Sequence, residues 1–120
     1  MANELTLSAS LAFLKGLSAA SASQLAQQFS VAGVNFTQET QSISHTAVVA
    51  LNLGGITTPG YIFIQNLDAT NFVKIYDSTG GNACIKLKPL EFALFRCATT
   101  TPSAEADTAA CIVQFLMIEN

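Results

Sequence analysis

The sequence predicts an all-β protein, an antiparallel β-sandwich of jelly-roll-like form with about eight or nine short strands. Short runs of β-branched and aromatic residues recur along the chain, and clusters of Gly, Pro, Asn, Asp, Ser and Thr separate them about every 10 to 12 residues. No segment with helical periodicity is long enough to cross over between parallel strands. At 120 residues, the chain is expected to form a single sandwich domain over residues 1–120.

The N-terminal part of the chain is extended at its start and ambiguous after that. Residues 4–14 alternate between apolar side chains on one face and mostly Ser and Thr on the other, which is the pattern of a β-strand. Residues 1–16 are therefore expected to form a first strand or an N-terminal arm. For residues 17–31 two alternatives remain open, because Ala and Gln favour a helix whereas the neighbouring strands favour a strand.

The centre of the chain carries its most apolar short run. Residues 61–64 are β-branched or aromatic, residues 72–76 resume an extended pattern, and residues 68–71 contain the turn formers Asp and Asn. We therefore expect a β-hairpin with a four-residue loop here. The preceding Pro59-Gly60 suits the central positions of a type II turn.

The other strands follow from the same alternation and complete the predicted core. They are expected at residues 34–43, 46–53, 83–88, 92–97 and 108–118, with a Thr-rich loop at 98–103. The apolar side chains of the strands predict a core that includes Leu11, Phe13, Tyr61, Phe63, Val73, Ile75, Phe92, Phe95, Ile112 and Phe115.

Charge and hydropathy narrow the possible partners. Half of the residues are hydrophobic and only 11% are charged, against about 25% in a typical domain. This shortage predicts a homo-oligomer whose surface is partly covered by other subunits, although a surface rich in Ser, Thr, Asn and Gln would also stay soluble. The net charge of −3 without a basic cluster argues against nucleic acid. No apolar run reaches the length of a membrane span. Residues 1–4 show no positive region before an apolar core, as a signal peptide would have, so assembly in the cytoplasm is expected.

Nothing in the sequence predicts catalysis or a cofactor. Cys84, Cys97 and Cys111 lack C-x-x-C spacing, and the single histidine lies far from them, so a zinc site is not expected and the cysteines are interpreted as small buried residues. Glu105 and Asp107 are too few for a calcium site. No nucleophile motif accompanies the histidine. We therefore expect a protein without enzymatic activity and without catalytic, cofactor or metal residues.

Three lysines are the candidate partner contacts. Lys74, Lys86 and Lys88 lie on neighbouring predicted strands and are expected to share one face. They would either meet an acidic partner or protect the edge of a sheet against aggregation.

Three stretches of the chain resemble a known group of proteins. They are PGYIFIQNLDATNFV at residues 59–73, IKLKPLEFALFR at residues 85–96, and the segment at residues 106–119. Together they resemble small virion structural proteins of tailed bacteriophages and prophages, which are β-proteins encoded among head and tail genes. The sequence departs from that group at Pro89-Leu90-Glu91, where Pro-Gly-Glu is expected.

The resemblance implies a role in the virion. It suggests a capsid decoration (cement) protein on the capsid surface, often trimeric, that binds the major capsid protein and stabilises the shell. A tail- or baseplate-associated structural protein is the alternative within the same group. A carbohydrate-binding module is an alternative from another class, but the chain has no Trp and only two Tyr to stack on sugar rings.

Overall fold

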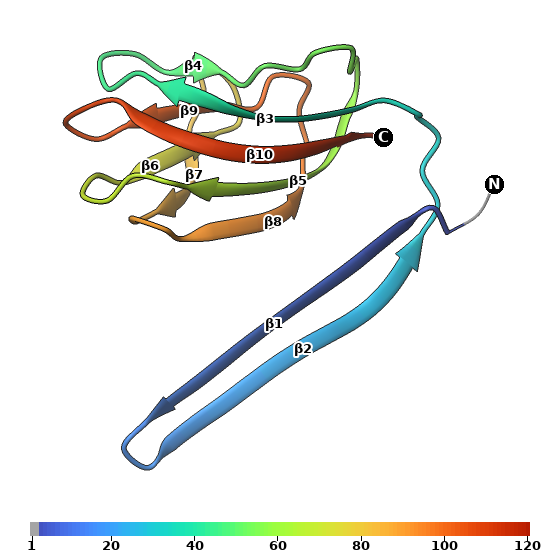
Figure 1. Ribbon diagram of the computed structural model, residues 1–120, viewed down its shortest axis with the longest axis vertical. Helices are drawn as coiled ribbons and strands as arrows, with labels where there is room; N and C mark the ends of the chain where they lie inside the picture. Colours follow the sequence, from blue (N-terminus) through green and yellow to red (C-terminus); the bar gives the residue numbers. More distant parts are fainter. Residues whose placement is uncertain (1–2) are drawn as a thin grey trace. The chain divides into compact units, whose positions relative to one another are not determined.

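The computed structural model describes residues 3–120 and contains ten strands and no helix among them (Figure 1). No helix in this part of the chain could therefore cross a membrane. The chain divides between Ala32 and Gly33 into two compact units. The strands are β1 (Leu5–Lys15), β2 (Ser18–Phe29), β3 (Phe36–Ile43), β4 (Val49–Ala50), β5 (Pro59–Asn66), β6 (Val73–Tyr76), β7 (Ala83–Leu87), β8 (Phe92–Arg96), β9 (Ser103–Ala106) and β10 (Cys111–Glu119).

The first unit is a long antiparallel hairpin of β1 and β2. The alternation expected at residues 4–14 is confirmed, and of the two alternatives for residues 17–31 the strand is the correct one. Gly16 forms the turn with φ of 59°, a conformation that glycine adopts without a steric penalty. The hairpin pairs only with itself among the described residues, so the expected single sandwich over residues 1–120 is confined to the second unit.

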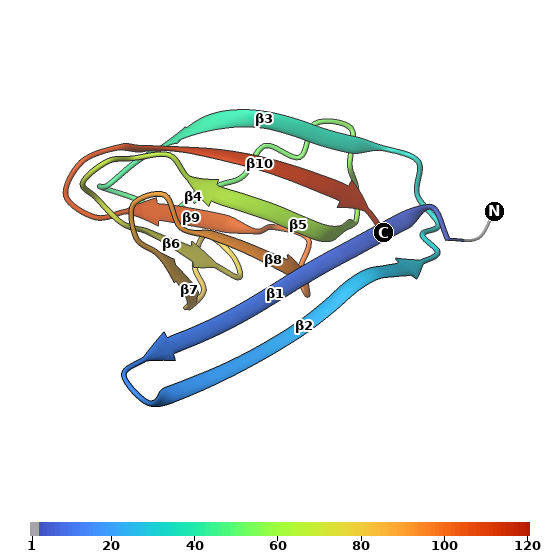
Figure 2. The same ribbon diagram turned by 60° about the horizontal axis from the view of Figure 1, so that its bottom comes forward.

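The second unit is a jelly-roll sandwich of two four-stranded sheets. One sheet has the strand order β3-β10-β5-β8 and the other has the order β4-β9-β6-β7 (Figure 2). All pairs of neighbouring strands are antiparallel, and every connection except β6–β7 leads from one sheet to the other. This arrangement confirms the predicted fold class, since both sheets bury an apolar face and expose the other.

The core lies between the two sheets and is built from one side of each strand. β10 alternates strictly, with Val113, Phe115 and Met117 buried and the residues between them more exposed. Ile62 and Ile64 of β5 face the same interior. The opposite sheet contributes the remaining large side chains, which include Val73, Ile75 and Leu87.

The predicted core is correct for part of its residues. Val73, Ile75 and Phe115 are buried, and Tyr61 and Phe95 are half-buried. The other five predicted core residues are exposed, namely Leu11 (74%), Phe13 (53%), Phe63 (37%), Phe92 (62%) and Ile112 (51%).

The errors have two physical causes. Phe63, Phe92 and Ile112 lie in runs of apolar residues, so the two-residue period cannot show which set faces the core. The structure turns Ile62 and Ile64 inward instead of Phe63. Leu11 and Phe13 do share one face, but the first unit contains no second layer to cover it.

The expected hairpin at residues 61–76 is wrong. β5 and β6 are inner strands of different sheets, so the segment between them crosses from one sheet to the other. Asn66, fully buried, holds this crossover with its side chain. Its Nδ2 donates to the carbonyls of Asn71 (2.9 Å) and Leu87 (3.1 Å), and its Oδ1 accepts from the backbone N–H of Asp68 (3.0 Å).

The Asp68 carboxylate completes the crossover turn. It accepts hydrogen bonds from the backbone N–H groups of Asn71 and Thr70, which lower its pKa below the ordinary value. The turn predicted at residues 68–71 is therefore present. It lies in a connection between the two sheets that the Asn66 side chain holds, and not in a hairpin.

Three other expected boundaries differ from the structure. Pro59 and Gly60 open β5 instead of forming a type II turn, because proline is tolerated as the first residue of a strand. The strand expected at residues 46–53 pairs only at β4, and the Gln41 side chain holds the flanking backbone through Ala50 and Asn52. β9 was missed, since its Ser-Ala-Glu-Ala sequence carries no strand signal without its neighbours.

Candidate protein-interaction surfaces

The outward side of the sheet β3-β10-β5-β8 is unusually apolar. Apolar side chains occupy both alternations of β5, β8 and β10, so the set that does not face the core remains at the surface. We call this set the outer apolar face. Its residues are Phe36, Tyr61, Phe63, Phe92, Leu94, Ile112, Leu116 and Ile118.

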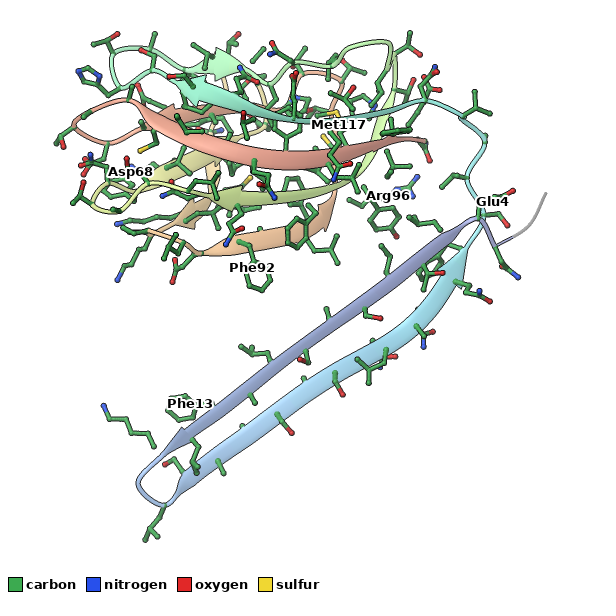
Figure 3. The ribbon with its side chains drawn as sticks, viewed as in Figure 1. Glu4, Phe13, Asp68, Phe92, Arg96 and Met117 are labelled. Atoms are coloured by element: carbon green, nitrogen blue, oxygen red, sulfur yellow. The ribbon has the colours of Figure 1, made fainter. Side chains whose placement is uncertain are left out.

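The strand register brings these residues together. Leu116 of β10 lies opposite Phe63 of β5, and Phe63 lies opposite Leu94 of β8, so one apolar row crosses three strands. The Phe63 and Phe92 rings stack with centroids 5.5 Å apart and planes inclined by 23°. Figure 3 shows the Phe92 side chain pointing away from the sandwich on the outside of β8. Stacked aromatic rings of this kind present a rigid apolar surface.

Polar side chains border and interrupt the outer apolar face. Gln65 lies next to Phe92 in the register, and its Nε2 donates to the Leu90 carbonyl (3.0 Å). At the other end of the strand, the Arg96 guanidinium lies 5.4 Å from the Tyr61 ring centroid and donates to Oδ1 of Asn120 (2.6 Å). An apolar centre with a polar rim is the usual composition of a protein–protein interface.

Two of the three candidate lysines meet on the other sheet. Lys74 of β6 and Lys86 of β7 are cross-strand partners, and their Nζ atoms lie 5.8 Å and 4.1 Å from the ring centroid of Phe72. The ring stabilises both ammonium groups through cation–π attraction, which offsets part of the repulsion between like charges placed opposite each other. Lys88 lies beyond the end of β7, in the turn that the Glu91 carboxylate holds through the Lys88 backbone N–H (2.8 Å).

Phe72 is the residue of this cluster that sequence reasoning missed. It was assigned to an expected strand, whereas the structure places it just before β6, beside the lysines. Glu105 of β9 lies opposite Lys74 in the register and accepts a hydrogen bond from the Tyr76 hydroxyl (3.1 Å). That bond raises the pKa of Tyr76, because the carboxylate favours the protonated phenol. The cluster therefore combines positive charge, an aromatic ring and one carboxylate.

The cysteines lie at three different depths and form no disulfide. Cys111 is buried as expected, and burial raises the pKa of its thiol. Cys84 is exposed and Cys97 is half-buried, contrary to the expectation that all three are buried. Both line a cavity of about 140 Å³ between the two sheets, beside Phe95 and Ile75. Among residues 3–120, no three His, Cys, Asp or Glu side chains gather in a way that could hold a metal ion, and Glu105 and Asp107 gain no third ligand.

Glu119 fixes the end of the last strand to two loops. Its carboxylate accepts hydrogen bonds from the backbone N–H groups of Thr57, Val34 and Asn35, each at 3.3 Å. The bond from Thr57, followed by those from Asn35 and Val34, lowers the pKa of the carboxyl group below its ordinary value of 4.5. Glu119 therefore anchors these two loops to the C-terminal end of β10.

Comparisons of the chain with protein-family models, with curated proteins and with solved structures found no match.

Proposed function

We propose that this chain is a structural protein of a tailed-bacteriophage virion, a capsid decoration protein that binds the major capsid protein as an oligomer and stabilises the shell without enzymatic activity. The resemblance of residues 59–73, 85–96 and 106–119 to small phage virion proteins supports this role. The jelly roll is compatible with it, since viral capsid proteins and lectins both use this fold, but a fold alone does not establish a function. The observation that carries the proposal is the outer apolar face.

The outer apolar face has the properties of a docking surface. Phe36, Phe92 and Ile112 are each at least half exposed although they lie on regular strands. Monomeric proteins seldom expose contiguous apolar patches of more than a few hundred Å², and larger patches mark interaction sites. In the proposed complex, the stacked Phe63 and Phe92 rings are the central anchors, because buried aromatic side chains contribute most of the binding energy in protein interfaces.

A shell protein gains from weak contacts that are repeated. Each subunit of an oligomer presents one outer apolar face, so several faces bind neighbouring capsid proteins together, and the effective concentration of the second contact is high. The Lys74–Lys86–Phe72 cluster adds a positively charged surface on the opposite sheet, which fits an acidic region of a neighbouring protein.

The copy number in virions tests the role directly. Virions produced from the genome that encodes the chain are purified, and the chain is quantified by mass spectrometry relative to the major capsid protein. Hundreds of copies per particle are expected for a decoration protein. Tens or fewer would indicate a tail or baseplate component, and absence from virions would refute the proposal. Glycan binding without incorporation into virions would instead favour a carbohydrate-binding module.

A matched pair of variants tests the docking surface. Phe92→Asp places a charge on the outer apolar face in place of the ring that stacks on Phe63, whereas Val34→Asp places one on a side chain that is 91% exposed outside that face. In competition with the wild-type chain, the Phe92 variant should be incorporated into virions at least about 30-fold less, as expected for the loss of about 2 kcal/mol at an interface hot spot. Equal incorporation of both variants would contradict the assignment of this face.

A further inference from the structure

The β1–β2 hairpin has no core of its own. All 12 residues of β2 are exposed, and in β1 all except the half-buried Leu5 and Leu7 are exposed. A two-stranded hairpin is only marginally stable in water without a packed face. A hairpin of this length with Leu11, Phe13 and Leu14 mostly at its surface therefore requires a partner that covers it.

The hairpin also lacks the usual protection against strand pairing. Proteins guard open strand edges with charged residues or proline. Between Leu5 and Val31 the sequence has no proline, and Lys15 at the turn is its one charged residue. The sheet has two strands, so both of its edges are open within the described residues. These features are those of a segment that is covered in the assembled protein.

The two faces of the hairpin differ in the size of their side chains. The large face carries Leu11 and Phe13 on β1, and the strand register places the smaller Ala22 and Ala20 opposite them. Between the bulge and the turn, the small face consists of mostly Ala and Ser side chains, with Leu14 near the turn. Its residues there are Ser10, Ala12, Leu14, Ala19, Ser21 and Ser23, and Leu25 lies at its bulge end opposite Ser8.

A β-bulge keeps the large face continuous along β1. Ser8 lies opposite both Leu25 and Ala26, and the Ser8 hydroxyl accepts a hydrogen bond from the Ala26 N–H (2.8 Å). Ala26 takes up the extra residue with φ of 55°. Because the extra residue lies in β2, the alternation of β1 is not shifted, and Leu5 and Leu7 stay on the same side as Leu11.

Small side chains also leave a hollow in the middle of the hairpin. A shallow depression of about 300 Å³ is lined by Ala9, Ser10, Leu11, Ala22, Ser23 and Gln24. Four of these residues, Ala9, Leu11, Ala22 and Gln24, lie on the large face, so the depression is on the same side of the hairpin as the protruding Leu11 and Phe13.

We propose that the hairpin is the self-association surface of this protein, and that the large face of one copy packs on the small face of the next. The faces are complementary in size, and neither carries a charge apart from Lys15 at the end, so a second copy satisfies both. Such a contact joins two different surfaces, and repeated contacts of this kind form a ring where the rotation between copies closes and an open stack where it does not. This inference goes beyond the proposed function, since it concerns the contact between copies and not the capsid.

The size of the hairpin favours contacts through both faces over a two-fold dimer through one. β1 has 11 residues, so the hairpin is about 37 Å long and about 10 Å wide at the usual spacings of strands. One face of roughly 370 Å² is about half of the roughly 800 Å² that each partner contributes to a standard interface, so each contact is small. A copy that uses both faces buries about twice the surface that a two-fold dimer buries. A dimer through the large face alone would also leave Leu14 uncovered. In an assembly of three or more copies, a hairpin with a neighbour on each side is covered on both faces.

Two variants and their mixture test this arrangement in the purified full-length chain. Variant one carries Leu11→Lys and Phe13→Lys on the large face, and variant two carries Ala12→Lys and Ser21→Lys on the small face. Light scattering should give the wild type at least three times the mass of the 12.6 kDa chain and each variant the mass of a monomer. A one-to-one mixture should form a dimer, because the intact large face of variant two meets the intact small face of variant one.

Val34→Lys is the control for these variants. It changes an exposed apolar side chain outside the hairpin, so this variant should keep the mass of the wild type. A monomeric wild type, a variant with unchanged mass, or a mixture that stays monomeric would each overturn the proposal. Hydrogen exchange of the wild type gives a second measurement, in which hairpin amides should be protected at high concentration and exchange on dilution. An oligomer with unprotected hairpin amides would refute the inference, and none of these outcomes depends on incorporation into virions.

Discussion

Asn66 is expected to be one of the most sensitive positions of the sandwich, although it is polar. Its side chain makes three hydrogen bonds at the crossover from β5 to β6, to the Asn71 and Leu87 carbonyls and from the Asp68 N–H. The residue is fully buried. Replacing it with alanine removes one side chain but leaves three backbone groups without partners.

The loss of stability expected for Asn66→Ala follows from these three backbone groups. An unsatisfied buried polar group costs about 1–3 kcal/mol, and less where water can reach it. The bond to Leu87 is buried and the other two are partly buried. Asn66→Ala should therefore destabilise the protein by about 3–5 kcal/mol, which is a large part of the roughly 5–15 kcal/mol of a typical domain.

Urea unfolding followed by circular dichroism measures this loss. Gln65→Ala is the matched control, because Gln65 is the preceding residue on β5 and its amide donates one exposed hydrogen bond to Leu90. The control should lose less than about 1 kcal/mol. The midpoint of Asn66→Ala should fall without a change in slope. If the two variants lie within about 1 kcal/mol of each other, the Asn66 side chain does not hold the crossover.

Three further predictions concern the core, one carboxylate and one turn. Phe115→Ala should lower the free energy of unfolding by about 3–5 kcal/mol, because it leaves a closed cavity. Phe63→Ala should lower it by roughly half of that, because the Phe63 ring is partly exposed. Equal losses for the two variants in urea unfolding would contradict the assigned faces. The folded-state pKa of Glu119 lies below its unfolded value of 4.5, so its contribution to stability is complete above that value and is lost as pH falls through the folded-state pKa. Glu119→Gln should therefore weaken the acid dependence of the melting temperature, and an unchanged dependence would refute this role. Leu90 has φ of 67°, a backbone conformation that is strained for a residue with a side chain. Leu90→Gly should therefore raise the melting temperature by the equivalent of up to about 1 kcal/mol. A lower melting temperature would show that the leucine side chain contributes more to stability than the strain in its backbone costs.

The turn at Leu90 links the sequence to the structure. Leucine occupies the position of this turn where glycine was expected, and the structure shows the left-handed backbone that glycine would adopt without strain. Hydrogen bonds hold this conformation, since the Leu90 N–H donates to the Asn66 carbonyl and the Glu91 N–H to the Lys88 carbonyl. The expected turn therefore forms with an unfavourable residue in it.

The sequence by itself determined the all-β class, the extended N-terminal segment and most of the strands. These features depend on local properties, namely the two-residue alternation of residues 4–14, the β-branched runs and the spacing of turn formers. The low charge also predicted covered surfaces, and the exposed hairpin and outer apolar face are surfaces that a partner could cover.

Only the tertiary structure decided which apolar side chains face the core and which strands pair. In Tyr61-Ile62-Phe63-Ile64 both faces are apolar, so the choice between them depends on the sheet that packs against β5. The crossover at Asn66 depends on the carbonyl of Leu87, which lies 21 residues away in the sequence. Contacts between segments that are distant in the chain decide which strands pair and which side chains face the core. No local pattern of residues contains that information.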